Sequence, residues 1–149
     1  MLPKLPEIFV PTTDKRRLVA AANDAGTNKL SIAGFLRAEL RRAHFCDLTA
    51  FPAQTVVMNG DVTYRIDWGA ESPPCRLVYP EEFSGNDNEI SLHSPLGVAL
   101  LGLHVGDRMP FFTPDHAFRL VTAVRANPAK VVSASSADIS EQAPPGRKG

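Results

Sequence analysis

The segment Ile90–Asp107, ISLHSPLGVALLGLHVGD, constrains the fold more than any other part of the chain. Its first residues alternate apolar and polar side chains, a period of two that predicts a half-buried strand. Ser94 then stands where a helix N-cap belongs, and Pro95 stands at the first helical position, where a missing N–H and a fixed φ are tolerated. Gly102 is a natural terminator, because glycine readily adopts the left-handed conformation after a helix. The segment therefore predicts a strand, a tight corner, a short helix and a turn.

Two amphipathic segments lie on the N-terminal side of the strands. Apolar residues recur at helical spacing from Leu18 to Ala25, and a second run begins after Ser31, which is a suitable N-cap. A glycine-containing turn joins the runs, so the pattern predicts an antiparallel helical hairpin. Each helix would hold about a dozen residues, which makes an arm about 20 Å long at 1.5 Å per residue. The apolar stripe of the second helix is Ile32, Phe35, Leu36, Leu40 and Ala43.

Short apolar runs separated by turn residues dominate the rest of the chain, which indicates strands. The candidates are Glu7–Val10, Val56–Met58, Val62–Ile66, Cys75–Tyr79, Ile90–His93, Arg108–Phe112 and Phe118–Val124. We therefore expect an α+β fold, in which a short N-terminal antiparallel helical hairpin is followed by a mostly antiparallel sheet wrapping one short helix. We expect an arm at residues 1–48, a sheet domain at 49–128 and a disordered tail at 129–149, where no core-forming pattern remains.

Charge is distributed unevenly, although the whole chain is neutral. Residues 1–46 hold eight Lys and Arg against four acids, whereas residues 47–128 hold five Arg against ten acids. A basic arm on an acidic body argues against nucleic-acid binding over the whole surface, but it permits a local contact with nucleic acid or with a partner through the arm. A solvated helix face is the alternative. The candidate contacts are Arg16, Arg17, Arg37, Arg41 and Arg42.

The other sequence signals predict a protein without an active site of its own. The histidines are too dispersed for a zinc motif and Cys46 and Cys75 show no metal spacing, so we expect no metal and no cofactor. Reduced thiols are expected, with a disulfide as the alternative. No apolar run approaches the ~20 residues of a membrane span, and no secretory signal is visible. We expect a cytoplasmic monomer that is not an enzyme.

The corner and its neighbours resemble the C-terminal domain of the bacterial Gre transcript-cleavage factors. The resemblance rests on SPLGVALLG followed by VGD, and it covers roughly residues 7 to 126. It implies an FKBP-like sheet domain. The N-terminal pattern is similar to that of the nucleoside diphosphate kinase regulator (Rnk) group, which consists of Gre-domain proteins with a short helical arm. The residues that carry this second similarity are Ala38–Ala43, Cys46, Pro52 and Val57–Asn59.

The resemblance also implies a binding site. In Gre factors the strand-to-helix corner helps to dock the protein on RNA polymerase at the entrance of the secondary channel. The matching positions here are His93, Ser94, Pro95 and Leu96. His93 replaces the usual amide or acid, which would make docking sensitive to pH, since histidine titrates near neutrality.

The arm tip differs from that of the cleavage factors, which carry paired acids at the tip of a long coiled coil and help to hold a catalytic metal ion there. The tip here offers Asn23 and one acid, Asp24, on a much shorter coiled coil. We therefore expect a non-catalytic bacterial transcription regulator that binds RNA polymerase and competes with longer-armed factors. One alternative is a true transcript-cleavage factor that uses Asp24. The other is an FKBP-like prolyl isomerase with a pocket of Tyr79, Phe83, Phe111, Phe112 and Phe118.

Overall fold

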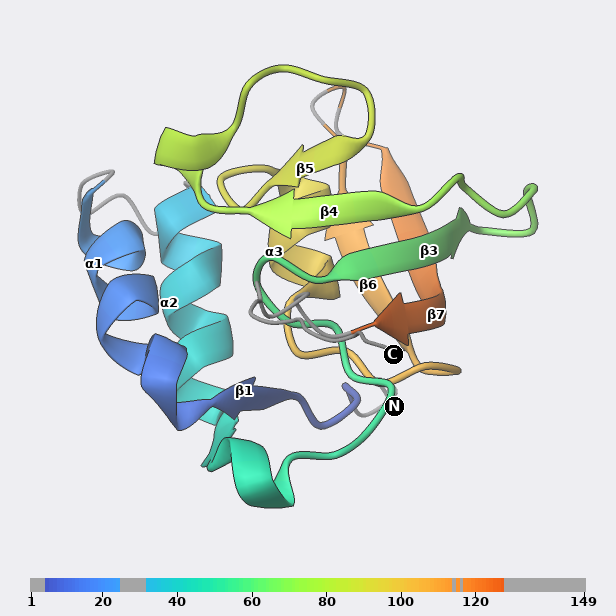
Figure 1. Ribbon diagram of the computed structural model, residues 1–149. Helices are drawn as coiled ribbons and strands as arrows, with labels where there is room; N and C mark the ends of the chain where they lie inside the picture. The colour runs from blue at the N-terminus through green and yellow to red at the C-terminus, as the bar shows by residue number, and fades with distance from the viewer. Residues whose placement is uncertain (1–4, 25–31, 114, 116, 128–149) are drawn as a thin grey trace, which may run out of the picture.

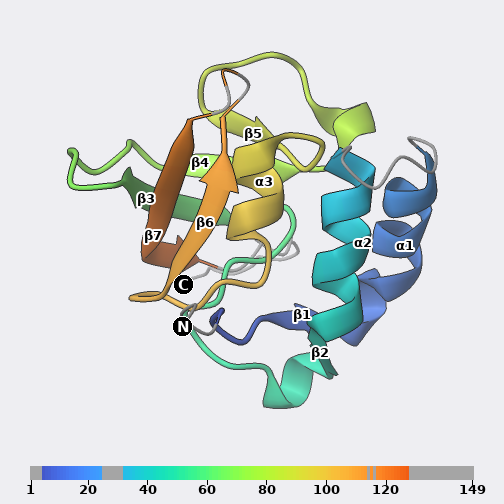
Figure 2. The same cartoon turned by 180° about the vertical axis from the view of Figure 1, so that it is seen from behind.

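The computed structural model describes residues 5–24, 32–113, 115 and 117–127, and shows a curled sheet with a helical hairpin at one side (Figure 1). The hairpin consists of α1 (Lys15–Asp24) and α2 (Ile32–Arg42). A short helix, α3 (Pro95–Leu100), lies between the sheet and the hairpin (Figure 2). The main sheet has the strand order β5-β4-β3-β7-β6. Its strands are β3 (Asp61–Ile66), β4 (Cys75–Val78), β5 (Glu89–Ser91), β6 (Arg108–Phe112) and β7 (Phe118–Asn127).

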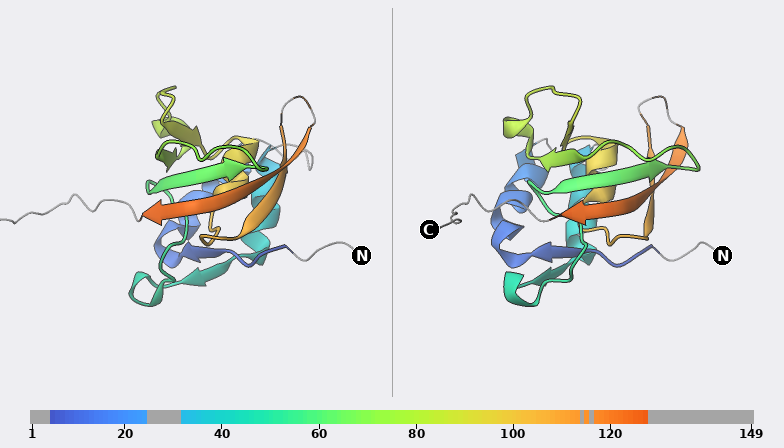
Figure 3. Two further views of the ribbon diagram at one scale, coloured as in Figure 1. Left: turned by 90° about the vertical axis from the view of Figure 1, so that its right-hand side faces the viewer. Right: turned by 45° about the vertical axis from the view of Figure 1, so that its right-hand side comes forward.

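The main sheet is antiparallel except where β4 pairs in parallel with β5. Together with the helices, this confirms the expected α+β fold with an antiparallel-rich, curled sheet. The long strand β7 pairs with both β3 and β6, and its curvature lets β6 lie against α3 (Figure 3). The sheet therefore wraps around α3.

A second, two-stranded sheet ties the N-terminal segment to the end of the hairpin. β1 (Phe9–Pro11) pairs in parallel with β2 (His44–Cys46). β2 was not expected, because a run of three residues is too short to show the period of a strand. Short 3-10 turns lie at Thr12–Asp14, Leu48–Ala50 and Pro80–Glu82.

The prediction of a strand at Val56–Met58 was wrong. These residues are buried but have no regular secondary structure. The segment forms main-chain hydrogen bonds with the end of α3 and with β4. The Val56 N–H donates to the Leu103 carbonyl at 2.9 Å, and the Asn59 N–H donates to the Leu77 carbonyl at 2.6 Å. The segment is apolar because it is buried, and burial does not require it to pair as a strand.

The hairpin and the sheet share one hydrophobic core. Leu18 and Leu36 on the hairpin are fully buried in the same cluster as Leu77, Leu92 and Leu100. The arm therefore lies against the body through its apolar stripe. In the described part of the chain, no helix is both long enough and apolar enough to cross a membrane.

A candidate partner-binding corner and groove

The chain turns sharply at Ser94, between β5 and α3. The Ser94 Oγ accepts a hydrogen bond from the Gly97 N–H at 3.0 Å and donates one to the Ser91 carbonyl at 2.7 Å. Gly97 is needed here, because a Cβ at this position would lie 2.1 Å from the Ser91 oxygen. The predicted cap and the Pro95 helix start are confirmed. The corner is therefore fixed in shape by its own hydrogen bonds.

The helix that follows the corner ends as the sequence predicts. Gly102 follows the C-cap residue and has a φ of 76°, in the left-handed region that favours glycine. A Cβ on Gly102 would lie 2.9 Å from the Ile8 Cβ, and its carbonyl accepts a bond from the Phe9 N–H at 3.1 Å. The turn thus seats the N-terminal segment directly against α3.

His93 joins the corner to the hairpin. Its Nε2 lies 2.9 Å from the Ala21 carbonyl oxygen of α1. Because a carbonyl can only accept, Nε2 must carry the proton in this contact. His93, Ser94, Pro95 and Leu96 are all half-buried, so the corner reaches the surface beside α1.

Arg17 makes a second link between the hairpin and the body. Its Nη2 lies 2.8 Å from Glu81 Oε2 and 3.1 Å from Glu82 Oε2. The guanidinium also stacks over the Tyr79 ring, 3.8 Å from the ring centroid. The hydrogen bond from Arg17 lowers the pKa of Glu81, and the same bond raises the pKa of Arg17. We call Arg17, Tyr79, Glu81 and Glu82 the hairpin clasp.

The other candidate arginines of the arm divide into two kinds. Arg37 donates to the Ala22 carbonyl at 2.7 Å, while Arg42 donates to Glu39 at 2.9 Å and to the Pro6 carbonyl at 2.6 Å. These two, like Arg17, hold the protein's own chain together. The side chains of Arg16 and Arg41 are exposed. At the arm tip, Asn23 is exposed and Asp24 ends α1, its side chain lying outside the described residues.

A large apolar groove of about 810 Å³ borders the corner, and Pro95 forms part of its wall. The groove lies between α2 on one side and α3, β6 and the start of β7 on the other. Four large apolar residues that line the groove are 42–58% exposed, namely Leu5, Phe35, Phe112 and Phe118. Contiguous exposed apolar surface of this kind usually marks a contact site. The groove and the corner together form a continuous candidate surface.

The groove was not predicted from the sequence, although Phe111, Phe112 and Phe118, which were named there for the pocket of the isomerase alternative, line it. Phe35 belongs to the apolar stripe of α2, yet it is 45% exposed, whereas Leu36 is fully buried. One signal was available in Phe111-Phe112, since consecutive strand residues point to opposite faces and one of the two had to leave the core. Phe112 contacts Phe118 edge to face, with ring centroids 5.5 Å apart.

The described residues contain no cluster of three or more His, Cys, Asp or Glu side chains that could hold a metal ion. Cys46 and Cys75 are free thiols, and Cys75 is buried. Burial raises the pKa of the Cys75 thiol, which keeps it protonated near neutral pH. The groove and the rigid corner beside it offer a defined shape and exposed apolar area, which are suited to binding a partner.

Comparison with known proteins agrees with this geometry. Residues 52–128 match the family profile described as "Transcription elongation factor, GreA/GreB, C-term". The chain belongs to the GreA/GreB family. The match begins just before the buried segment at Val56 and ends with β7, so it includes the corner.

Within the GreA/GreB family the chain falls in the nucleoside diphosphate kinase regulator group. It is 34% identical over 109 residues to the "Regulator of nucleoside diphosphate kinase" of Escherichia coli K12, a match that covers 73% of this chain and 80% of that protein. The protein of the same name from Shigella flexneri matches equally well. A solved structure described as "Prokaryotic transcription elongation factor GreA/GreB from Nitrosomonas europaea" is 31% identical with a TM-score of 0.65, over 83% of this chain and 99% of that one. These relatives support a regulatory role associated with transcription.

Proposed function

We propose that this GreA/GreB-family protein is a non-catalytic bacterial regulator that binds RNA polymerase near its secondary channel through the sheet domain. The observation that carries the proposal is the Ser94–Pro95 corner, which is locked by hydrogen bonds and still reaches the surface beside an apolar groove. A preorganised surface loses little conformational entropy when it binds. The corner supplies the fixed polar contact, and the groove supplies the apolar area.

The hairpin would accompany the docked domain and obstruct the channel without reaching the catalytic centre. Its helices have 10 and 11 residues, which makes the arm only about 15 Å long at 1.5 Å per residue. His93 and the hairpin clasp hold this arm beside the corner. Arg16 and Arg41, which are exposed, remain the candidate arm contacts to polymerase or to nucleic acid.

Direct binding to purified core RNA polymerase tests the proposal. The double variant Ser94→Asp with Pro95→Ala changes the corner surface. An aspartate can still accept from the Gly97 N–H but cannot donate to the Ser91 carbonyl, so circular dichroism must show that the variant is folded. We expect its affinity for polymerase to fall at least tenfold. A control variant, Thr12→Asp with Pro74→Ala, changes two exposed positions away from the corner and should bind as the wild type does. No binding by the wild type, or equal binding by both variants, would reject the proposal.

The groove also gives a reason to test the isomerase alternative. Phe111, Phe112 and Phe118 line it, as an aromatic pocket for proline requires. Tyr79 and Phe83 do not line it, since Tyr79 is buried beneath Arg17 and Phe83 is 43% exposed on the loop after β4. We expect the protein not to accelerate isomerisation of a proline tetrapeptide. Acceleration that disappears with Phe112→Ser would favour the isomerase instead.

A further inference from the structure

The only tryptophan of the chain is almost completely exposed. Trp68 lies in the turn between β3 and β4, and 89% of it is open to solvent, more than any other large apolar residue described. This turn projects from the end of the sheet that is opposite the hairpin (Figure 1, Figure 2). The turn is therefore remote from the corner, although its partner strand β7 begins at Phe118, which lines one end of the groove. A side chain of this size and exposure is typical of a contact point for another molecule.

The turn that carries Trp68 is held rigidly. The Asp67 N–H donates to the Leu120 carbonyl at 2.7 Å, and the Asp67 carboxylate accepts bonds from the Leu120 N–H and from Arg119, both at 3.0 Å. The Gly69 N–H donates to the Ile66 carbonyl at 2.9 Å. Asp67 has a φ of 51°, an unusual conformation for a residue with a side chain, which these bonds maintain. The backbone at Trp68 therefore has little freedom to lose on binding.

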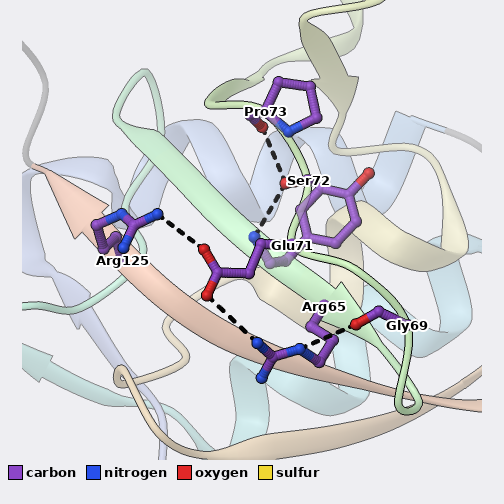
Figure 4. Close-up of polar contacts among 7 residues, drawn as sticks. Arg65, Gly69, Glu71, Ser72, Pro73 and Arg125 are labelled. Atoms are coloured by element: carbon purple, nitrogen blue, oxygen red, sulfur yellow. Dashed lines mark hydrogen bonds and ion pairs between the residues drawn. The ribbon is translucent and has the colours of Figure 1, made fainter.

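Arginines surround this turn, and carboxylates orient them. Glu71 lies between two strands and pairs with Arg65 of β3 at 3.3 Å and with Arg125 of β7 at 2.9 Å (Figure 4). The Arg65 Nε also donates to the Gly69 carbonyl at 3.0 Å, which ties Arg65 to the turn. A guanidinium has five N–H donors, so each of these arginines keeps donors for a further acceptor. The side chains remain substantially exposed.

The positive charges of residues 47–127 are concentrated on the strands of the main sheet. All five arginines of residues 47–127 lie on β3, β4, β6 and β7, and this part of the chain has no lysine. Only three of its ten acids accompany them, namely Asp61 on β3 and Asp67 and Glu71 in the turn, while the other seven lie on loops and on β5. The strand register places Arg65 and Arg108 on either side of Thr122. Around Trp68, Arg65, Arg119 and Arg125 therefore exceed Asp67 and Glu71 by one charge, whereas the rest of residues 47–127 has two arginines against eight acids.

We propose that this surface, which we call the Trp68 face and define as Trp68 with Arg65, Arg119 and Arg125, binds single-stranded nucleic acid. A base stacks on the indole, and phosphate oxygens accept hydrogen bonds from the oriented guanidinium groups. Only an unpaired strand offers the flat face of a base to such a side chain. Exposed ion pairs contribute little to stability, so phosphates can share these arginines with Glu71 and Asp67. The site goes beyond the proposed polymerase contact and does not depend on it.

The single tryptophan gives a direct readout for this site. Oligouridylate and oligothymidylate of about 12 nucleotides, a length that one small domain can cover, are titrated into the full-length protein while tryptophan fluorescence and the anisotropy of a labelled oligonucleotide are followed. We expect saturable quenching with either strand, at low salt. Trp68→Ala should weaken the anisotropy-measured affinity by about tenfold, the size expected for one stacked base. Phe83→Ala, which removes an exposed aromatic ring elsewhere, should leave the affinity unchanged.

Salt dependence separates the phosphate contacts from stacking. Arg125→Gln should lower the slope of log affinity against log salt by about 0.7, the value for one phosphate contact on a single strand. Lys15→Gln removes an exposed cation from α1 that is not among the candidate contacts, and it should leave that slope unchanged. Absence of quenching by both oligonucleotides, or equal affinity of Trp68→Ala and the wild type, would overturn the proposal. So would a Trp68→Ala variant that binds oligonucleotides normally but loses affinity for core polymerase, since the turn would then be a protein contact.

Discussion

At the scale of single residues, Ser94 connects the stability of the fold to the shape of the candidate site. Its hydroxyl satisfies the Gly97 N–H and the Ser91 carbonyl at the same time. Ser94→Ala should lower the free energy of unfolding by about 1 kcal/mol, the usual cost of losing an N-cap. Urea denaturation followed by circular dichroism measures this change. A variant as stable as the wild type would show that the corner does not depend on the cap.

Gly102 and Gly85 form a matched pair for separating backbone strain from crowding. Both have a positive φ, but a Cβ at Gly102 would meet Ile8 and Phe9 at 2.9–3.2 Å, whereas a Cβ at Gly85 would meet nothing within 4 Å. Gly102→Ala should therefore cost about 2–4 kcal/mol, from left-handed strain and overpacking together. Gly85→Ala should cost about 1 kcal/mol from strain alone. Urea denaturation of both variants checks the difference, and equal losses would contradict the crowding argument.

At the scale of elements, the hairpin clasp makes the seating of α1 dependent on pH. Arg17 lowers the pKa of Glu81 in the folded protein from its ordinary value of 4.5. A carboxyl with a lowered folded-state pKa stabilises the fold above its unfolded pKa, and this stabilisation is lost as the pH falls through the folded pKa. Arg17→Gln should therefore lower the melting temperature at pH 7, and the difference from the wild type should shrink once the pH falls below about 4.5.

Thermal melts between pH 7 and pH 3 measure this effect. Arg16→Gln is the matched control, because Arg16 is an exposed neighbour on the same helix. Its difference from the wild type should be small and should not change over this range. A pH-independent difference for Arg17→Gln would mean that packing over Tyr79, and not the ion pair, holds the helix.

Elements defined by short-range signals could be predicted from the sequence, and those defined by distant partners could not. The corner and α3 follow from Ser94, Pro95 and Gly102, whose roles depend on backbone geometry within a few residues. β2 depends on pairing with β1, and the irregular segment at Val56 depends on hydrogen bonds to Gly102 and Leu103, all of which are far away in sequence. The candidate site also depends in part on residues that are distant in sequence. The corner was expected, but the groove needs α2 and β6 to be placed side by side before the exposure of Phe35 and Phe112 becomes visible.

At the scale of the whole molecule, the corner and the turn between β3 and β4 lie at opposite ends. The corner contacts α1 through His93, and the groove borders α2. The turn between β3 and β4, which carries Trp68, projects from the far end of the sheet (Figure 1). Contact at the corner therefore leaves the turn that carries Trp68 accessible, so polymerase docking and nucleic-acid binding can be separated by mutation, although the groove reaches Phe118, next to Arg119 of the Trp68 face. Phe112→Ser should impair only the first, and Trp68→Ala only the second.

The proposed function also predicts competition. Addition of this protein to stalled elongation complexes should reduce RNA cleavage by a long-armed Gre factor, because both would occupy the same docking site, and it should produce no cleavage alone. Phe112→Ser with Phe118→Ser should weaken this inhibition at least tenfold, since it removes exposed apolar area from the groove. Asp24→Ala should inhibit as the wild type does, because obstruction needs no carboxylate. RNA shortening by this protein alone that disappears with Asp24→Ala would instead identify a cleavage factor, and unchanged inhibition by the double variant would remove the groove from the docking site.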